Sequence, residues 1–179
     1  MIKSVCVYGG SNSNSSAKYS DDAFRVGETL AKIGITVYYG GGACGVMGSL
    51  ADGVMSVGGI IKGVIPQFMV ERGWAYDKVE HIVVDDMHIR KKTMLDMADM
   101  AIALPGSNGT FEEVLEAITW RQLGLFGGKV VIYNSHGYYD SLIQMFNKAT
   151  EDGFMNVGVD FFTVANNIDE LISIIENNH

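Results

Sequence analysis

Cysteine is scarce in this 179-residue sequence, which has only Cys6 and Cys44 and no CxxC pair. Two such cysteines indicate neither a disulfide framework nor a zinc site. Apolar runs stay far below the ~20 residues of a membrane span, and nothing resembles a signal peptide, so we expect a cytoplasmic protein that binds no membrane. Lysine and arginine number 13 against 21 acidic residues, a net charge of −8, which argues against a general nucleic-acid surface. An anion would have to be bound locally, by oriented amides and a few cations.

What the sequence does contain is an alternation of short apolar runs and amphipathic segments. Hydrophobic residues make up 47% and charged residues 19%, a globular balance, and no linker or repeat interrupts the chain. We therefore expect a single α/β domain over residues 1–179 with a doubly wound, mostly parallel, Rossmann-like sheet. The expected strands are Ser4–Tyr8, Ile35–Tyr39, Ile60–Ile65, His81–Val84, Met100–Leu104, Val130–Tyr133 and Phe161–Ala165, and the expected helices include Asp21–Ile33, Val46–Val57, Phe111–Leu123, Tyr139–Glu151 and Asp169–Glu176.

Glycine-rich turns follow the first two expected strands. The first turn is Gly9 to Asn14, which includes Gly10 and Ser11, and the second is Gly40 to Gly48, with five glycines in nine residues. Ligands of open α/β sheets bind at the carboxyl ends of strands, so these turns are candidates for ligand contact. Close packing of helix on sheet would account for one or two of the five glycines, but hardly for all.

The stretch from Leu104 to Glu113 is the strongest site candidate. A buried strand ends there, Gly106 and Gly109 turn the chain, and a helix begins. A helix N-terminus carries unpaired N–H groups and a partial positive charge, so the turn is suited to a phosphate. The alternative is that Thr110 and Glu113 form a capping box, which would satisfy those donors without a ligand.

Two other segments carry unusual residues. Arg90, Lys91 and Lys92 open an expected helix, where cations oppose the macrodipole; such a conflict marks a functional site or, alternatively, a solvated charged face. The least regular segment, Gln67 to Lys78, places Trp74 among charges and could be a flap over a pocket.

The helix after the central turn has two distinct faces. Its apolar stripe is Phe111, Val114, Leu115 and Ile118, and at 100° per residue Glu113, Glu116 and Trp120 lie opposite. An exposed tryptophan there favours a homodimer interface. The alternative is that Gln67–Lys78 of the same chain covers Trp120.

Several ordered motifs resemble those of one family. Residues 105–113, PGSNGTFEE, resemble the PGGxGTxxE signature of the Lonely guy family, cytokinin riboside 5′-monophosphate phosphoribohydrolases long mislabelled as lysine decarboxylases. The segments at 39–42 (YGGG), 45–48 (GVMG), 87–91 (MHIRK), 119–124 (TWRQLG) and 137–140 (GYYD) resemble further family motifs, so the match spans roughly Val5 to Phe154.

The resemblance implies a function and a site. It implies hydrolysis of a nucleoside 5′-monophosphate, AMP or an N6-substituted AMP, to free base and ribose 5-phosphate, with neither cofactor nor metal, by a homodimer. Arg90 and Glu113 would be catalytic: Glu113 would stabilise the oxocarbenium-like state and orient water, and Arg90 would fix the substrate. The expected substrate- and phosphate-binding residues are Gly10, Ser11, Gly41, Gly42, Gly45, Met87, Lys91, Pro105, Gly106, Ser107, Asn108, Gly109 and Thr110.

One departure bears on activity. The second glycine of the family motif is Ser107 here. If that position needs a positive φ or bare backbone against the phosphate, serine costs on the order of 1 kcal/mol and crowds the ligand; alternatively, its hydroxyl donates to a phosphate oxygen. A non-catalytic nucleotide-binding module is therefore the alternative function. A pyridoxal-phosphate lysine decarboxylase is disfavoured, since nothing singles out a Schiff-base lysine.

Overall fold

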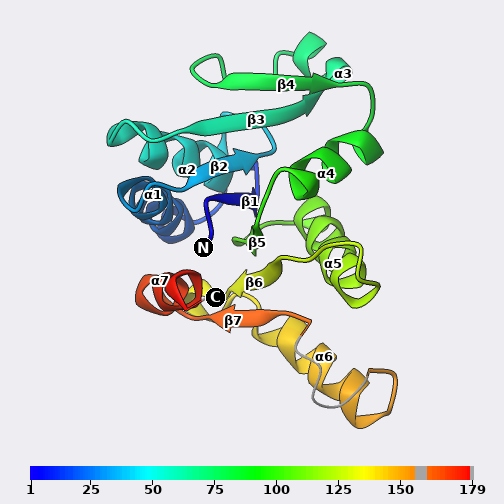
Figure 1. The fold of residues 1–179 in the computed structure, drawn as a ribbon. Helices are drawn as coiled ribbons and strands as arrows, with labels where there is room; N and C mark the ends of the chain where they lie inside the picture. Colours follow the sequence, from blue (N-terminus) through cyan, green and yellow to red (C-terminus); the bar gives the residue numbers. More distant parts are fainter. Residues whose placement is uncertain (156–160, 178–179) are drawn as a thin grey trace.

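A single twisted sheet runs through the middle of the molecule (Figure 1). The computed structural model describes residues 1–155 and 161–177, within which seven strands pair in the order β4-β3-β2-β1-β5-β6-β7. Every neighbouring pair is parallel, which confirms the expected fold class. The strands are β1 (Ser4–Tyr8), β2 (Thr36–Tyr39), β3 (Ile61–Pro66), β4 (Glu80–Val84), β5 (Met100–Ala103), β6 (Lys129–Tyr133) and β7 (Thr163–Ala165).

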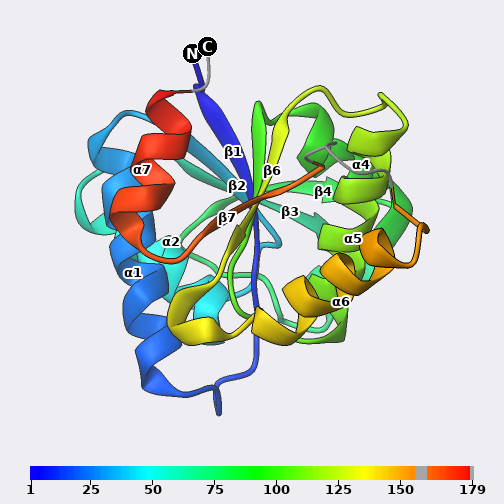
Figure 2. The same cartoon turned by 90° about the horizontal axis from the view of Figure 1, so that it is seen from below.

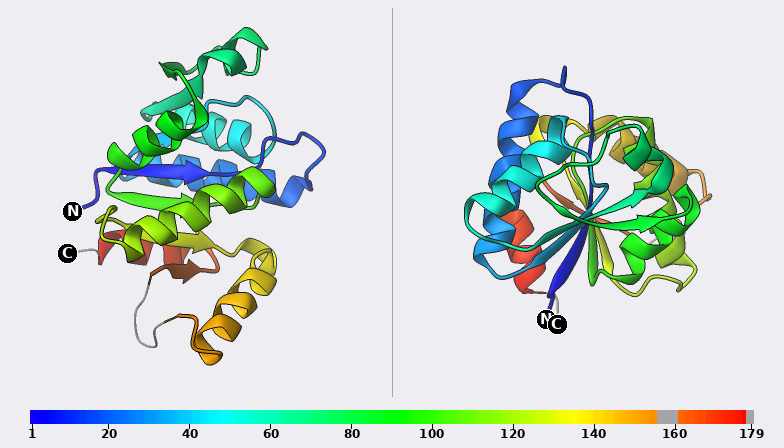
Figure 3. Two further views of the ribbon diagram at one scale, coloured as in Figure 1. Left: turned by 90° about the vertical axis from the view of Figure 1, so that its right-hand side faces the viewer. Right: turned by 90° about the horizontal axis from the view of Figure 1, so that it is seen from above.

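Helices cover both faces of the sheet (Figure 2). One face carries α1 (Ala17–Lys32), α2 (Gly45–Ser56) and α7 (Ile168–Glu176), and the other carries α4 (Met87–Asp96), α5 (Asn108–Gln122) and α6 (Asp140–Glu151). The view from above shows the same division (Figure 3). A buried apolar cluster fills the space on each side. None of the described helices is long and apolar enough to cross a membrane.

The burial of the strands follows from their place in the sheet. All four residues of β5 are buried, because this central strand is covered by helices on both faces. The edge strand β4 has no fully buried residue, and its Val83 is exposed. A central strand therefore has the continuous apolar run Met100–Leu104, and an edge strand has the mixed run His81–Val84.

Several helices begin earlier than their apolar periodicity predicts. α1 starts at Ala17 rather than Asp21, and α5 starts at Asn108 rather than Phe111. The first turn of a helix is decided by capping and backbone geometry and need not carry apolar residues. The segment expected to be irregular contains a short helix, α3 (Gln67–Glu71), directly after β3.

The strand order reverses beside β1. Its neighbours are β2 on one side and β5 on the other, so the segments leaving the carboxyl ends of β1 and β5 diverge. In doubly wound sheets a ligand-binding crevice opens at such a switch point.

Candidate active site

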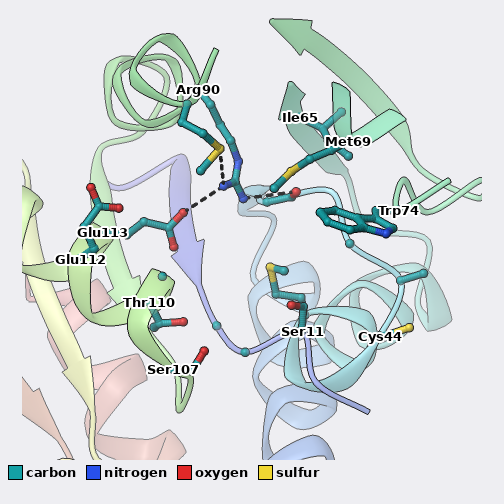
Figure 4. A pocket seen from close by; sticks show the side chains of 18 of the residues that line it. Ser11, Cys44, Ile65, Met69, Trp74, Arg90, Ser107, Thr110, Glu112 and Glu113 are labelled. Atoms are coloured by element: carbon teal, nitrogen blue, oxygen red, sulfur yellow. Dashed lines mark hydrogen bonds and ion pairs between the residues drawn. The ribbon is translucent and has the colours of Figure 1, made fainter. Parts of the chain in front are cut away.

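A cavity of about 540 Å³ lies at the carboxyl ends of the central strands (Figure 4). Its walls come from the segments that follow β1, β2 and β3 and from the starts of α4 and α5. This is the crevice expected where the strand order reverses. Arg90 and Glu113 both face it, with Ser107 and Thr110 on one side and Trp74 on the other.

Arg90 is held in place by main-chain carbonyls. Its side chain is buried; Nε donates to the carbonyl oxygen of Val64 at 3.0 Å and Nη2 to that of Gly40 at 3.3 Å. A Cβ at Gly40 would lie 2.2 Å from Nη2, so only glycine leaves room for this guanidinium. The first glycine after β2 is thus required by the arginine, although it was not among the expected site residues.

The three adjacent cations have three different surroundings. Arg90 points into the cavity, while Lys91 is buried and pairs with Glu112 and, at 2.9 Å, with Glu116. Lys92 is exposed and pairs with Asp96 one turn later. The alternative interpretation, that the three cations form a solvated charged face, is therefore correct for Lys92 alone.

The expectation that these cations open their helix is wrong. α4 begins at Met87, and the carboxylate of Asp86 caps it by accepting from the amides of His88 and Ile89, each at 2.8 Å. A carboxylate at the N-cap complements the macrodipole. Arg90, Lys91 and Lys92 therefore lie at or after the end of the first turn, where the partial positive charge of the helix N-terminus opposes them little.

Glu113 forms the second half of the central pair. Its Oε1 lies 3.4 Å from Nη1 of Arg90, and the two side chains are 9% and 7% exposed. Burial raises the pKa of Glu113 to about 7, while the positive charge of Arg90 opposes the rise. The carboxyl group therefore changes its ionisation near neutral pH, where a catalytic acid or base is most effective.

The capping-box interpretation of Thr110 and Glu113 is wrong. Ser107 is the N-cap of α5, with the Phe111 amide donating to its carbonyl oxygen at 2.9 Å, and no side chain bonds at this cap within the described residues. Thr110 already lies inside the first turn. Glu113 lies one turn further along α5, on the face that meets Arg90.

The central turn is packed tightly against its neighbours. The amide of Gly10 donates to the carbonyl of Pro105 at 3.0 Å, and the hydroxyl of Tyr138 donates to the carbonyl of Gly106. A Cβ at Gly106 would lie 2.0 Å from Oγ1 of Thr110. Gly106 is therefore required for close packing.

Ser107 causes no backbone strain. Its φ is −117° and its ψ −155°, an extended conformation open to any residue, so the expected strain cost of about 1 kcal/mol does not arise. The residue is exposed and lines the cavity. The strain alternative is therefore wrong, whereas crowding of the phosphate and donation by the hydroxyl both stay predictions.

The cavity gathers some of the expected site residues and leaves others behind its walls. Gly41 and Gly45 have positive φ values of 79° and 63°, which the second glycine turn requires of its backbone. The carbonyl of Gly41 also accepts a hydrogen bond from the amide of Tyr76 at 2.9 Å. Those in the lining are Gly10, Ser11, Gly42, Met87, Arg90, Ser107, Gly109, Thr110 and Glu113; those outside it are Gly41, Gly45, Lys91, Pro105, Gly106 and Asn108. Direct substrate contacts by either group stay predictions.

Sequence reasoning missed the apolar end of the cavity. Met47, Ile65, Met69 and Trp74 line it, and none was named as a site residue. Their sequence signals were weak: Met47 lies in the family segment 45–48, Ile65 lies at the carboxyl end of β3, and Met69 and Trp74 belong to the suspected flap. Methionine and isoleucine side chains look the same in a sequence whether they face a core or a cavity.

The second face of α5 also differs from expectation. Val114 and Ile118 are buried, but Leu115 is 41% exposed and lies outside the apolar stripe. Trp120 is half-buried against the apolar cluster beneath α5, so the prediction that it lies opposite the core is wrong. That cluster contains no described residue of Gln67–Lys78, so nothing supports the alternative cover for Trp120.

Comparisons with known proteins agree with the geometry. The family described as "Possible lysine decarboxylase" matches residues 47–175. The chain is 41% identical over 152 residues to the probable cytokinin riboside 5′-monophosphate phosphoribohydrolase LOGL1 of Oryza sativa, covering 84% of this chain and 68% of that protein. It is 40% identical to the enzyme LOG1 of Arabidopsis thaliana, covering 87% and 73%. This chain belongs to the Lonely guy family.

Solved structures share the fold of this Lonely guy family member at lower identity. The molybdenum cofactor binding protein of Rippkaea orientalis superposes with a TM-score of 0.75 at 20% identity, covering 98% of this chain and 96% of that one. The molybdenum cofactor carrier protein of Chlamydomonas reinhardtii gives 0.73 at 19% identity, covering 98% and 97%. At such identities the likeness concerns the fold alone.

Proposed function

We propose that this protein hydrolyses the N-glycosidic bond of a nucleoside 5′-monophosphate, AMP or an N6-substituted AMP, to the free base and ribose 5-phosphate. The observation that carries the proposal is the buried Arg90–Glu113 pair facing a cavity whose wall includes the N-terminus of α5. The named activity of the relatives supports it, since they are phosphoribohydrolases that share about 40% of this sequence.

The phosphate belongs at the start of α5. Ser107, Gly109 and Thr110 line the cavity there, and the N-cap side chain leaves the amides of the first turn to other partners. Those amides and the positive end of a 15-residue helix attract a phosphate. The turn thus fixes one end of the nucleotide within one helical turn of Glu113.

The chemistry belongs to the Arg90–Glu113 pair. The bond from C1′ to the base nitrogen breaks, the base leaves with its electron pair and gains a proton, and a water oxygen bonds to C1′. The carboxylate of Glu113 stabilises positive charge at C1′ and accepts the proton of the attacking water. Arg90, fixed by two carbonyls, orients the substrate and balances the carboxylate.

Product analysis tests the proposal. Incubation with AMP should yield adenine and ribose 5-phosphate in equal amounts, and Glu113→Gln should abolish release while the protein still binds AMP. Binding of AMP without release of base by the wild-type protein would instead establish the alternative, a non-catalytic nucleotide-binding module.

A decarboxylase of the kind named by the family description is not supported by the cavity. Pyridoxal phosphate enzymes hold their cofactor on a lysine Schiff base. Among the described residues, no lysine lines the cavity, and Lys91 pairs with Glu112 and Glu116. The released products, a base or carbon dioxide, separate the two activities directly.

We also propose that the protein is a homodimer that joins through α4 and α5. Apolar side chains are exposed on these neighbouring helices and just after α5, namely Ile89, Leu115, Leu123 and Leu125. A two-fold contact is the commonest way to bury such a surface. Light scattering at micromolar concentration should give twice the mass of one chain, and Leu115→Lys with Leu123→Lys should shift it toward the monomer.

The cytoplasmic location stays a proposal as well. Cys6 is buried and Cys44 exposed, and neither forms a disulfide in the structure. Fractionation of cells, with detection of this protein, would test it.

A further inference from the structure

Trp74 is an unusual residue to find half-exposed at the wall of a cavity. Its side chain is 51% exposed and lines the cavity beside Met69 and Gly73. Figure 4 shows it on the side opposite Ser107, Thr110 and Glu113, with Arg90 pointing in from the top of the view. The cavity thus has the hydroxyl groups and the Glu113 carboxylate on one side and an aromatic and apolar surface on the other.

Trp74 is also held firmly. The guanidinium of Arg72 lies 5.2 Å from the centre of its ring and 5.2 Å from that of Phe68, so the cation contacts two aromatic rings of one short segment. The amide of Trp74 donates to the carbonyl of Met69 at 3.1 Å. The next residue, Ala75, pairs with Gly42 in an antiparallel bridge, which ties the segment to the second glycine turn.

A preformed aromatic surface is suited to one kind of ligand. Heteroaromatic bases stack on indole rings whatever their hydrogen-bonding edges, and the surrounding Ile65, Met47 and Met69 offer apolar and polarisable contacts. A flat base extending from C1′ of a nucleotide whose phosphate lies at Ser107 would reach this end of the cavity. The aliphatic part of the wall alone would not distinguish a base from any apolar group.

We propose that Trp74 is the stacking platform for the base and so selects nucleotides over phosphorylated sugars; this inference rests on the proposed function. Arg72, which contacts the rings of both Phe68 and Trp74, supports the platform. Specificity for the base is then provided by a segment outside the family motifs, which hold the phosphate and the reactive pair.

The test compares ligands with and without a base. Ribose 5-phosphate carries the phosphate and sugar of AMP but no base, and it competes for the same cavity. For Trp74→Ala we expect the KM for AMP to rise about 10-fold, within the range of alanine substitutions at stacking aromatics, with inhibition by ribose 5-phosphate unchanged. Trp74→Phe keeps an aromatic ring and should restore most of the affinity.

Equal weakening of AMP and ribose 5-phosphate would overturn the proposal, because it would mean that Trp74 merely supports the fold of its segment. An unchanged KM would overturn it too. If the wild-type protein released no base, the proposed function would fail on its own, and calorimetric titration of the same variants with AMP and ribose 5-phosphate would still decide the stacking.

Fluorescence provides a second readout. The chain has two tryptophans, so Trp120→Phe leaves Trp74 as the only indole. Stacking predicts that AMP quenches its emission and that ribose 5-phosphate does not. Equal responses to both ligands, or a response to neither, would contradict contact between the base and Trp74.

Discussion

Replacing Glu113 by glutamine should change how stability depends on pH, in a direction that the structure determines. The pKa of this carboxyl group is raised from 4.5 to about 7 in the folded protein, mainly by burial. Between these values the folded state binds more protons than the unfolded state. The stability of the wild-type protein should therefore fall as pH rises through this window. Glutamine does not ionise, so the variant lacks this loss.

The magnitude follows from the shift. A change of about 2.5 units corresponds to roughly 3 kcal/mol at 1.36 kcal/mol per unit. Below pH 4.5 both proteins place a neutral group beside Arg90 and should be similarly stable. At pH 8 the variant should be more stable by about 3 kcal/mol, a difference of roughly 6–12 °C in Tm for a chain of this length.

Thermal melts of both proteins in the same buffers from pH 4.5 to 8 measure the effect, with the wild-type series as the control. Loss of base release by the variant at every pH would show that the stabilised protein is also inactive. A stability difference that stays constant with pH would refute the argument. If the variant were less stable at pH 8, the ion pair with Arg90 would outweigh the burial of the carboxylate.

Three further predictions concern turnover and binding. Because Glu113 is proposed to act as a carboxylate, kcat/KM for AMP should rise with pH through about 7; a falling profile in stopped product assays would make it the acid instead. Arg90→Ala should lower turnover by about 100-fold or more, whereas Lys92→Ala, the matched control at an exposed lysine, should change turnover less than about twofold. Arg90→Lys should not restore activity, because a lysine side chain cannot bridge two carbonyls and the carboxylate. Ser107→Gly should raise the Kd for AMP about threefold to tenfold through loss of one hydrogen bond without raising Tm, and tighter binding in calorimetry would contradict the hydroxyl's role.

The sequence by itself determined the architecture. Alternating apolar runs and amphipathic segments specify a parallel sheet with helices on both faces, because parallel strands need crossovers and buried strands must be apolar throughout. The position of the site followed from the same logic, since the turns after Tyr8, Tyr39 and Leu104 had to meet at one edge of the sheet. The family motifs then named Arg90 and Glu113.

Only the tertiary structure decided where each of these side chains lies. Arg90, Lys91 and Lys92 are adjacent in the sequence, yet one faces the cavity, one lies between two carboxylates and one is exposed. Successive residues of a helix point about 100° apart, so a motif cannot tell which of them reaches a ligand until the start of the helix and its neighbours are known.

The same reason applies to the central turn and to Trp74. Sequence spacing allowed Thr110 and Glu113 to cap their helix, but the helix starts at Asn108, so both residues lie inside it, and Glu113 pairs with an arginine 23 residues earlier in the chain. Trp74 reaches the cavity because Ala75 pairs with Gly42, a long-range bridge that no local sequence pattern predicts. Local propensity and period specify elements, whereas the faces that meet are decided by packing between segments far apart in the sequence.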